Sequence, residues 1–302
     1  MSFIPLIIRS KNLFSSESSL KYFLTQALAS SVLLFSIILI YLFINFKINF
    51  IVYNIILISS TIILKRGTAP FHFWFPSVIE GLRWNSNFLL ITWQKLAPLI
   101  ILSYRLSLNL LIFIIFFSII FGRLGGINQT SLRKLIAFSS INHLGWILSG
   151  MLNNEIIWFR YFLFYSFLNF SIVFIFNRFK IFNINQTFKI FNSNKFIIIS
   201  IFLLLLSLGG LPPFLGFLPK WIIIELLVKN NIFVTLLFIL FITLITLYFY
   251  LRIIYASLLL NHSNIKWSFK TNSFNKIPKI LLFVIFLSLN GLIMINIFYY
   301  FF

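Results

Sequence analysis

Long runs of apolar residues, separated by short polar connections, constrain this chain more than any other feature of its sequence. Of its 302 residues, 61% are hydrophobic and 9% are charged, whereas a typical soluble domain carries about 25% charged residues. About 20 apolar residues suffice for a helix to cross a bilayer, and only helices and closed barrels satisfy their backbone hydrogen bonds in lipid. The sequence therefore predicts an all-α, polytopic membrane protein without a soluble domain.

The apolar runs predict about nine transmembrane segments. Residues 1–19 are expected to hold the remnant of a helix and a polar loop, and residues 20–302 a single transmembrane bundle. Within that bundle, residues 177–195 form the longest polar stretch and are expected to be a basic loop or an interfacial segment. The uninterrupted spans are predicted at residues 20–45, 88–104, 108–121, 129–152, 156–176, 232–259 and 280–300.

Two further apolar runs are interrupted by prolines, and each is predicted to form a broken transmembrane helix. Pro70 interrupts the run at residues 50–81, and Pro212 and Pro213 interrupt the run at residues 196–228. Proline lacks a backbone donor and clashes with the preceding turn, so the freed backbone groups need protein or water as partners. Paired interruptions are typical of inverted repeats; two unrelated proline kinks are the alternative.

The charged residues exclude several classes of function. The formal net charge is +20, from 24 lysines and arginines against 4 acidic residues. Most basic residues stand at the ends of apolar runs, where they commonly anchor membrane helices, whereas a nucleic-acid-binding surface would gather them on one solvated face. We therefore expect no nucleic-acid partner. With no cysteine, three scattered histidines and no nucleotide-binding motif, the chain is also expected to hold no metal and no cofactor.

Three lysines lie deep inside apolar runs. Lys65 lies about 15 residues, roughly 22 Å, into its run, Lys95 is seven residues past the start of its span, and Lys220 follows the second break. A lysine at mid-membrane costs on the order of 2.5–3.5 kcal/mol, so each must face protein, water or another charge. Burial lowers the pKa of a lysine side chain, and a neighbouring cation lowers it further. A row of such lysines is therefore suited to moving protons.

Other polar residues extend this hypothesis and leave alternatives open. His143, within the span at 129–152, is a further relay candidate because imidazole titrates near neutral pH, but it could equally be a hydrogen-bonded packing residue. Glu80, Glu225 and Lys134 are possible charge partners, and Lys134 is otherwise expected to be an interfacial anchor. Each buried lysine could instead be a structural charge held by backbone carbonyls or by a glutamate.

Six stretches of the chain, in order and at similar spacing, carry a specific resemblance to a known family. They are KYFLTQALAS at 21–30, PFHFWFPSVIEG at 70–81, LLITWQKLAP at 89–98, GGINQTSLRKLIAFSSINHLGW at 125–146, LSLGGLPPFLGFLPKW at 206–221 and LYFYLRIIY at 247–255. The chain thus resembles the NADH–ubiquinone oxidoreductase chain 2 family, antiporter-like membrane subunits of mitochondrial respiratory complex I. This resemblance covers nearly the whole chain.

The resemblance implies an antiporter-like bundle of two inverted five-helix repeats, each containing one broken helix. It implies that Lys65, Lys95 and Lys220 form a polar axis proposed to carry protons. His143 matches a family histidine between them, and Lys134 matches a family lysine, which raises it above a plain anchor.

The resemblance also implies a role as a core membrane-arm subunit of proton-translocating NADH:ubiquinone reductase, in the mitochondrial inner membrane and beside other membrane-arm subunits. NADH, FMN, iron–sulfur clusters and ubiquinone are then expected in those other subunits, and this chain itself carries no redox chemistry. Two alternatives stay open from the residues alone. One is a component of a standalone multi-subunit cation/proton antiporter, and the other is a structural subunit that conducts nothing.

The chain departs from the family at its beginning. The family starts with a further helix and then a second one that carries an intramembrane glutamate, whereas this chain starts after that point, at Met1. We expect a start assigned too far downstream or a partial sequence; loss of the element in this lineage is the alternative. Translation of the upstream genomic sequence distinguishes the two.

Overall fold

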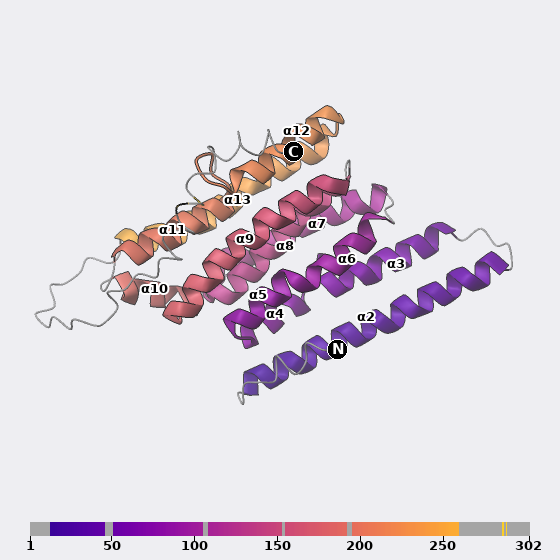
Figure 1. Ribbon diagram of the computed structural model, residues 1–302, viewed down its shortest axis with the longest axis horizontal. Helices are drawn as coiled ribbons and strands as arrows, with labels where there is room; N and C mark the ends of the chain where they lie inside the picture. The colour runs from indigo at the N-terminus through magenta and orange to yellow at the C-terminus, as the bar shows by residue number, and fades with distance from the viewer. Residues whose placement is uncertain are drawn as a thin grey trace, which may run out of the picture. The chain divides into compact units, whose positions relative to one another are not determined.

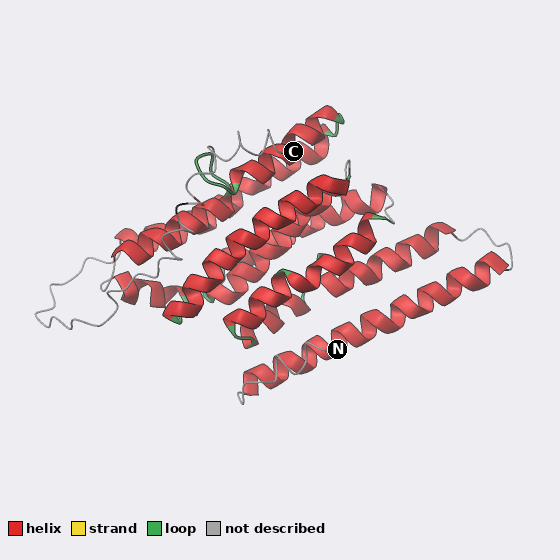
Figure 2. Ribbon diagram, in the orientation of Figure 1, coloured by secondary structure: helices red, strands yellow, loops and turns green. Residues whose placement is uncertain are grey.

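The computed structural model describes residues 13–45, 51–104, 108–152, 155–191, 195–259, 286 and 288. Their regular structure is helical (Figures 1 and 2), with one isolated antiparallel bridge between Ser131 and Asn183. The prediction of an all-α chain is confirmed. The helices are α2 (Leu13–Asn45), α3 (Ile51–Arg66), α4 (Trp74–Gly81), α5 (Trp84–Ile91), α6 (Trp93–Ser103), α7 (Leu108–Ile127), α8 (Leu132–Met151), α9 (Glu155–Phe179), α10 (Ile184–Phe191), α11 (Lys195–Gly209), α12 (Phe217–Lys229) and α13 (Phe233–Leu259).

Four of the described helices are long and apolar enough to cross a membrane, at Leu13–Leu42, Asn109–Ile127, Ile156–Phe179 and Phe233–Tyr255. They coincide with four of the predicted spans, whereas the interrupted runs form shorter helices. The helix remnant before residue 13, and all of the predicted last span at residues 280–300 except residues 286 and 288, lie outside the described residues.

The chain forms two compact units, which we describe one at a time. Unit 1 comprises Met1–Gln129 and Arg133–Trp158, and unit 2 comprises Thr130–Leu132 and Phe159–Phe302. The prediction of one continuous bundle over residues 20–302 stays a prediction.

In unit 1, the first predicted helix break is confirmed. Helix α3 ends at Arg66, Gly67 adopts a φ of +68°, and α4 begins only at Trp74. Glycine is required at this turn for two reasons. Its left-handed backbone conformation disfavours other residues, and a Cβ on Gly67 would lie 2.8 Å from the Cβ of Phe75. The chain therefore folds tightly over Phe75, which is fully buried.

Unit 1 also corrects three local predictions. The serines at residues 15–19, predicted to lie in a polar loop, are part of α2, and the hydroxyl of Ser18 donates to the carbonyl of Ser15. The predicted single span at 88–104 begins earlier, at Trp84, and is divided at Thr92 into α5 and α6. The Gly-rich segment after residue 121 continues α7 to Ile127.

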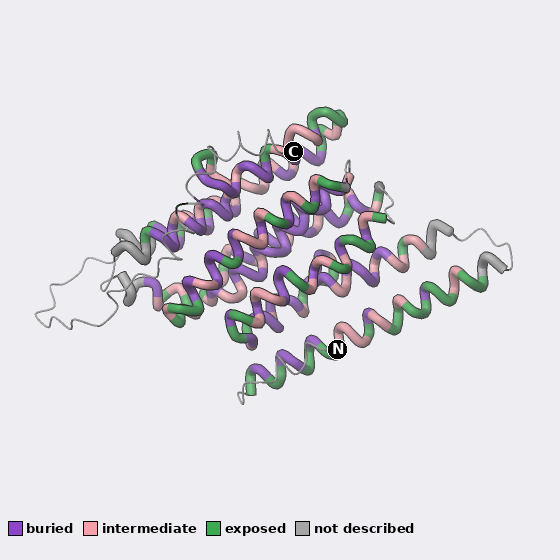
Figure 3. Tube along the Cα trace, viewed as in Figure 1, coloured by how far each residue is buried: buried purple, intermediate pink, exposed green. Residues whose placement is uncertain are grey.

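The helices of unit 1 differ greatly in burial (Figure 3). Helix α2 packs on α3 and α4, and α3 packs on α6, yet most of α2 is exposed, including Leu20, Leu24 and Leu28. Helix α8 is almost entirely buried. It approaches α7 closely, since a Cβ on Gly122 would lie 2.7 Å from the backbone nitrogen of Asn142. The apolar exposed face of α2 suits contact with lipid, and the core of unit 1 lies around α8.

In unit 2, the second predicted break is confirmed as well. Helix α11 ends at Gly209, Gly210 adopts a φ of +78°, the two prolines lie in the loop, and α12 begins at Phe217. Helix α13 packs on both α11 and α12. The segment predicted as a basic loop or interfacial segment contains the short helix α10, which packs on α11 and α13.

Candidate functional site: buried cations beside two helix breaks

Lys95 is the most completely enclosed of the three predicted lysines. It lies on α6, just after the interruption at Thr92, and 2% of the residue is exposed. Its Nζ donates to Oγ of Ser140 on α8 at 3.1 Å, and it lies 4.4 Å from the centroid of the Phe75 ring. Among the described residues, a hydroxyl and an aromatic face, and no carboxylate, contact this ammonium group. The hydrogen bond and the cation–π contact stabilise the ammonium group, but neither supplies a negative charge to balance it.

Sequence reasoning missed Ser140, which lies 45 residues from its partner in the chain. Its hydroxyl accepts from Lys95 and donates to the carbonyl of Ala137 at 2.7 Å. Ser140 and His143 are three residues apart and so share one face of α8, where both are buried. On the same helix, Asn142 accepts a hydrogen bond on Oδ1 from Nε of Arg123 at 3.0 Å. Helix α8 therefore carries a run of buried polar groups that begins at the ammonium of Lys95.

At the first break, the structure buries a different cation from the one predicted. Lys65 is only half-buried, and within the described residues its ammonium makes no hydrogen bond or ion pair. The next residue, Arg66, is 2% exposed, and its Nη2 donates to the carbonyl of Pro98 on α6. Sequence reasoning chose Lys65 because of its depth in the apolar run. Depth in an apolar run does not indicate which of two adjacent basic side chains points into the protein.

The last carbonyls of α3 are capped by side chains from other helices. The indole Nε1 of Trp74 donates to the carbonyl of Leu64 at 3.1 Å, and Nε2 of Gln26 on α2 donates to the carbonyl of Lys65 at 3.2 Å. A break inside a membrane helix needs such partners because no water is available in lipid. Trp74 and Gln26 therefore hold the break that places Phe75 beneath Lys95.

Lys220 occupies the second break in a different way. It lies on α12, is 5% exposed, and donates from Nζ to the carbonyls of Leu208 at 3.3 Å and Gly209 at 2.6 Å. These carbonyls end α11, where the helix dipole favours a positive charge. A Cβ on Gly210 would lie 2.7 Å from Nζ, so the glycine leaves the space that the ammonium occupies. The open alternative of a lysine held by backbone carbonyls thus describes the contacts seen here.

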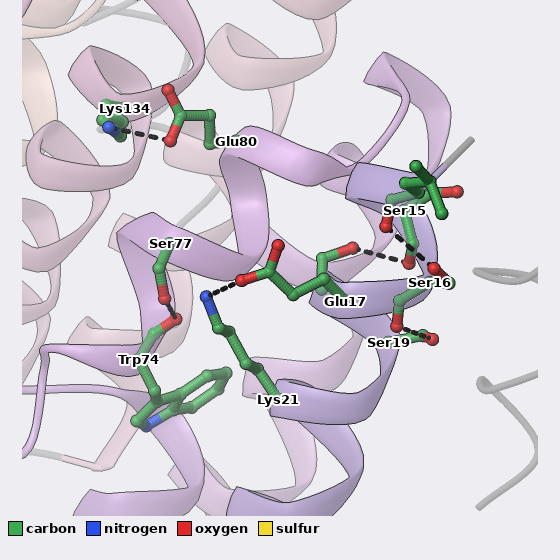
Figure 4. Close-up of polar contacts among 11 residues, drawn as sticks. Ser15, Ser16, Glu17, Ser19, Lys21, Trp74, Ser77, Glu80 and Lys134 are labelled. Carbon is green, nitrogen blue, oxygen red and sulfur yellow. Dashed lines mark hydrogen bonds and ion pairs between the residues drawn. The ribbon is translucent and has the colours of Figure 1, made fainter.

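The described glutamate side chains pair with lysines outside the predicted row. Glu80 and Lys134, both predicted as potential charge partners, pair with each other at 2.7 Å (Figure 4). Glu225 pairs with Lys229 at 2.8 Å, one helical turn away on α12. The remaining pair, Glu17 with Lys21 at 2.6 Å on α2, lies on an exposed surface (Figure 4).

The chemical capacity of these groups is acid–base. Among the described residues, no group of three or more His, Cys, Asp or Glu side chains is placed to hold a metal ion. Lys95 and Lys220 each present a buried ammonium, and Ser140 presents a hydroxyl that both accepts and donates. These are groups that hold, release and pass on protons.

Comparison with known proteins places this arrangement in a family. Residues 1–246 match the family described as NADH:quinone oxidoreductase/Mrp antiporter, TM. NADH-ubiquinone oxidoreductase chain 2 of Anopheles gambiae is 54% identical over 301 residues, which cover 99% of this chain and 88% of that one. Its counterpart in Aedes aegypti is 52% identical over the same shares of the two chains.

The fold has a counterpart among solved structures. A chain of respiratory complex I from Thermus thermophilus with bound aureothin matches with a TM-score of 0.77 and 20% identity, over 94% of this chain and 67% of that chain. The predicted antiporter-like helix bundle with two broken helices is therefore confirmed. The predicted lysine lies before the break in unit 1, at Lys65, and after it in unit 2, at Lys220.

Proposed function

The chain belongs to the NADH:quinone oxidoreductase/Mrp antiporter family, and from this premise we propose that it carries protons through the membrane arm of respiratory complex I. Its relatives are named as chain 2 of NADH-ubiquinone oxidoreductase. The chain is accordingly an antiporter-like, multi-pass subunit of that complex in the mitochondrial inner membrane, beside other membrane-arm subunits. Relatives that carry this name do not favour a component of a standalone antiporter.

One observation carries the proposal for proton transfer, namely that the buried ammonium of Lys95 contacts Ser140 and Phe75 and no carboxylate of the part of the chain that the structure describes. A charge enclosed in this way costs free energy, and ionisable residues inside a membrane commonly mark a path for protons or ions. Lys95 can pass a proton toward α8 if the hydroxyl of Ser140 turns from the carbonyl of Ala137 to the imidazole of His143 or to a water molecule. The hydroxyl then takes a proton from Lys95 while the imidazole or the water takes the proton that the hydroxyl gives up. His143, on the same face of α8, is the next titratable group along this helix.

The protonation state of Lys220 affects its contact with the end of α11. While it is protonated, its ammonium holds the carbonyls of Leu208 and Gly209. A neutral amine interacts less favourably with the negative end of the α11 dipole. Loss of the proton therefore loosens the contact between α11 and α12. In this proposal, Lys65 is the half-buried lysine at the corresponding break of unit 1 and completes the row with Lys95 and Lys220.

The proposal assigns the remaining parts of the reaction to other subunits. Electron transfer from NADH to ubiquinone requires NADH, FMN, iron–sulfur clusters and ubiquinone, and we expect other subunits of the complex to bind them. This chain contributes acid–base groups and a packed helical frame around them. The alternative is a structural subunit that carries no protons. Such a subunit would need the same packed helices, but its lysines would not have to release protons.

Substitution of the buried lysines tests the proposal. Complex I that carries Lys95→Met or Lys220→Met is reconstituted into liposomes, and protons translocated per NADH oxidised are measured. Each variant is expected to lower this ratio, because methionine preserves the length of the side chain without the titrating group. Lys21→Met, which removes an exposed lysine of α2, serves as the control. Full ratios in both buried variants would establish a structural role instead.

A further inference from the structure

A second buried cation lies beside Lys95 and has no role in the relay proposed above. Arg66 is the last residue of α3 and, like Lys95, is 2% exposed. Its Nη2 donates to the carbonyl of Pro98, while Nε and Nη1 have no hydrogen-bond partner within the described residues. Guanidinium remains protonated at any physiological pH. Arg66 is therefore a permanent charge inside unit 1.

The geometry holds this charge near Lys95. Helices α3 and α6 pack together, and Pro98 is three residues after Lys95, about 4.5 Å farther along the axis of α6. The bond to Pro98 thus holds the guanidinium of Arg66 about one helical turn from Lys95, and two like charges held this near inside a protein repel each other. In the described part of unit 1, the carboxylates of Glu17 and Glu80 form ion pairs with other lysines. No ion pair with a described carboxylate offsets this repulsion.

Opposing influences therefore act on the proton of Lys95. The hydroxyl of Ser140 and the ring of Phe75 stabilise the ammonium form. A like charge nearby disfavours it. A relay group must bind a proton and also release it, and a balance of this kind serves both steps.

We propose that Arg66 is a fixed positive charge that makes Lys95 release its proton toward Ser140. This inference rests on the proposed function, since it gives Arg66 a part in the same transfer. Arg66 acts through Lys95 and is itself never deprotonated, so it tunes the site and is not a relay residue.

A purely structural role is the competing explanation, because the bond from Arg66 to Pro98 also ties α3 to α6. Two substitutions separate the roles. Arg66→Gln keeps an N–H donor for the carbonyl of Pro98 and removes the charge. Arg66→Lys keeps the charge and removes the guanidinium. Arg83→Gln removes an exposed arginine that precedes α5 and is the matched control.

The experiment measures NADH oxidation coupled to proton uptake in liposomes that contain reconstituted complex I. Native gel electrophoresis of the intact complex verifies that each variant has assembled, and oxidation of NADH with ferricyanide, which bypasses the membrane arm, normalises the rates for the amount of complex. We expect Arg66→Gln to slow coupled turnover about tenfold, the size of effect that one nearby charge exerts inside a protein. Arg66→Lys and Arg83→Gln are expected to turn over within about twofold of the unmodified complex.

The outcomes distinguish this inference from the function on which it rests. Unchanged coupled turnover in Arg66→Gln, or a loss in assembled Arg66→Lys as large as in Arg66→Gln, would overturn the role of the charge. If Arg66→Gln does not assemble, Arg66→Lys still decides, because a structural guanidinium predicts its failure and a fixed charge predicts its activity. Full proton translocation in Lys95→Met would instead overturn the proposed function itself.

Discussion

At the scale of single residues, the chemistry depends on contacts between helices that local sequence does not encode. The depth of Lys95 and Lys220 in apolar runs predicted that both would be buried, and the structure buries both. Their partners could not be predicted in this way. Ser140 meets Lys95 only through the packing of α6 on α8, and Arg66 turns inward where Lys65 does not. A side chain at a helix end takes its direction from neighbouring helices, and one sequence carries little signal for that choice.

Removal of the hydroxyl beside Lys95 tests the first step of the relay. A hydrogen bond to a charged group contributes about 1.5–3 kcal/mol, so Ser140→Ala is expected to slow coupled proton transfer about tenfold or more. Ser139→Ala is the matched control, because Ser139 is equally buried and bonds only to the carbonyl of Ile136. The rate of proton uptake at saturating NADH measures the effect. Equal rates in the two variants would remove Ser140 from the path.

At the scale of helices, prolines predicted where both breaks occur, but glycines shape them and side chains cap them. The helical backbone ends in a turn at Gly67 and at Gly210, both with positive φ. The first break is capped by Trp74 and Gln26, and the second by Lys220 itself. The sequence carries no such signal for the interruption at Thr92, since neither proline nor glycine occupies that position. The interruption is seen in the backbone angles of Thr92, a φ of −107° and a ψ of −73°, just before α6 begins.

The glycine of the second break yields a prediction for Lys220. Gly210→Ala must adopt a left-handed conformation, at about 1–2 kcal/mol, and its Cβ would occupy the position of the ammonium. We expect a lower yield of assembled complex and a lower proton-to-electron ratio in whatever assembles. Gly209→Ala is the control, because the new methyl would crowd the flexible end of Leu247 and make an ordinary contact with Tyr250. Equal yields and ratios for the two variants would show that Lys220 does not need its position at the end of α11.

The indole that caps the first break yields a second prediction at this scale. Trp74→Phe keeps the aromatic packing and loses the donor to the carbonyl of Leu64, which costs about 1 kcal/mol. The complex is expected to lose coupled activity at a lower temperature than the unmodified form. Trp221→Phe, at an exposed site of α12, should have no such effect. Thermal inactivation curves of the two variants give the comparison, and coincident curves would contradict the capping role.

At the scale of the whole molecule, the abundance of apolar residues predicted a membrane protein correctly, because hydrophobic length alone decides that class. Hydrophobicity cannot assign each helix to lipid or to protein, since both surroundings are apolar. The structure distinguishes these helices in unit 1, because α8 is buried within the protein and α2 is exposed along most of its length. Without cysteine in the chain, single cysteines can report on such surroundings.

Cysteine labelling tests the lipid-facing surface of α2. Leu28→Cys, at a position that is 62% exposed, is expected to resist a membrane-impermeant maleimide and to react with a lipid-soluble one. Glu17→Cys, near the polar end of the same helix, should react with both reagents. Labelling is detected on the subunit after separation of the complex. Reaction of Leu28→Cys with the impermeant reagent would place this face of α2 in water.

The central claim is that Lys95 titrates during turnover, and Lys95→Arg tests this most directly. Arginine keeps a positive charge at the site but does not release its proton. The complex is therefore expected to assemble and to oxidise NADH with ferricyanide, yet to translocate fewer protons per NADH than the unmodified complex. A full proton-to-NADH ratio in liposomes that contain Lys95→Arg would contradict the claim, since a fixed charge would then suffice.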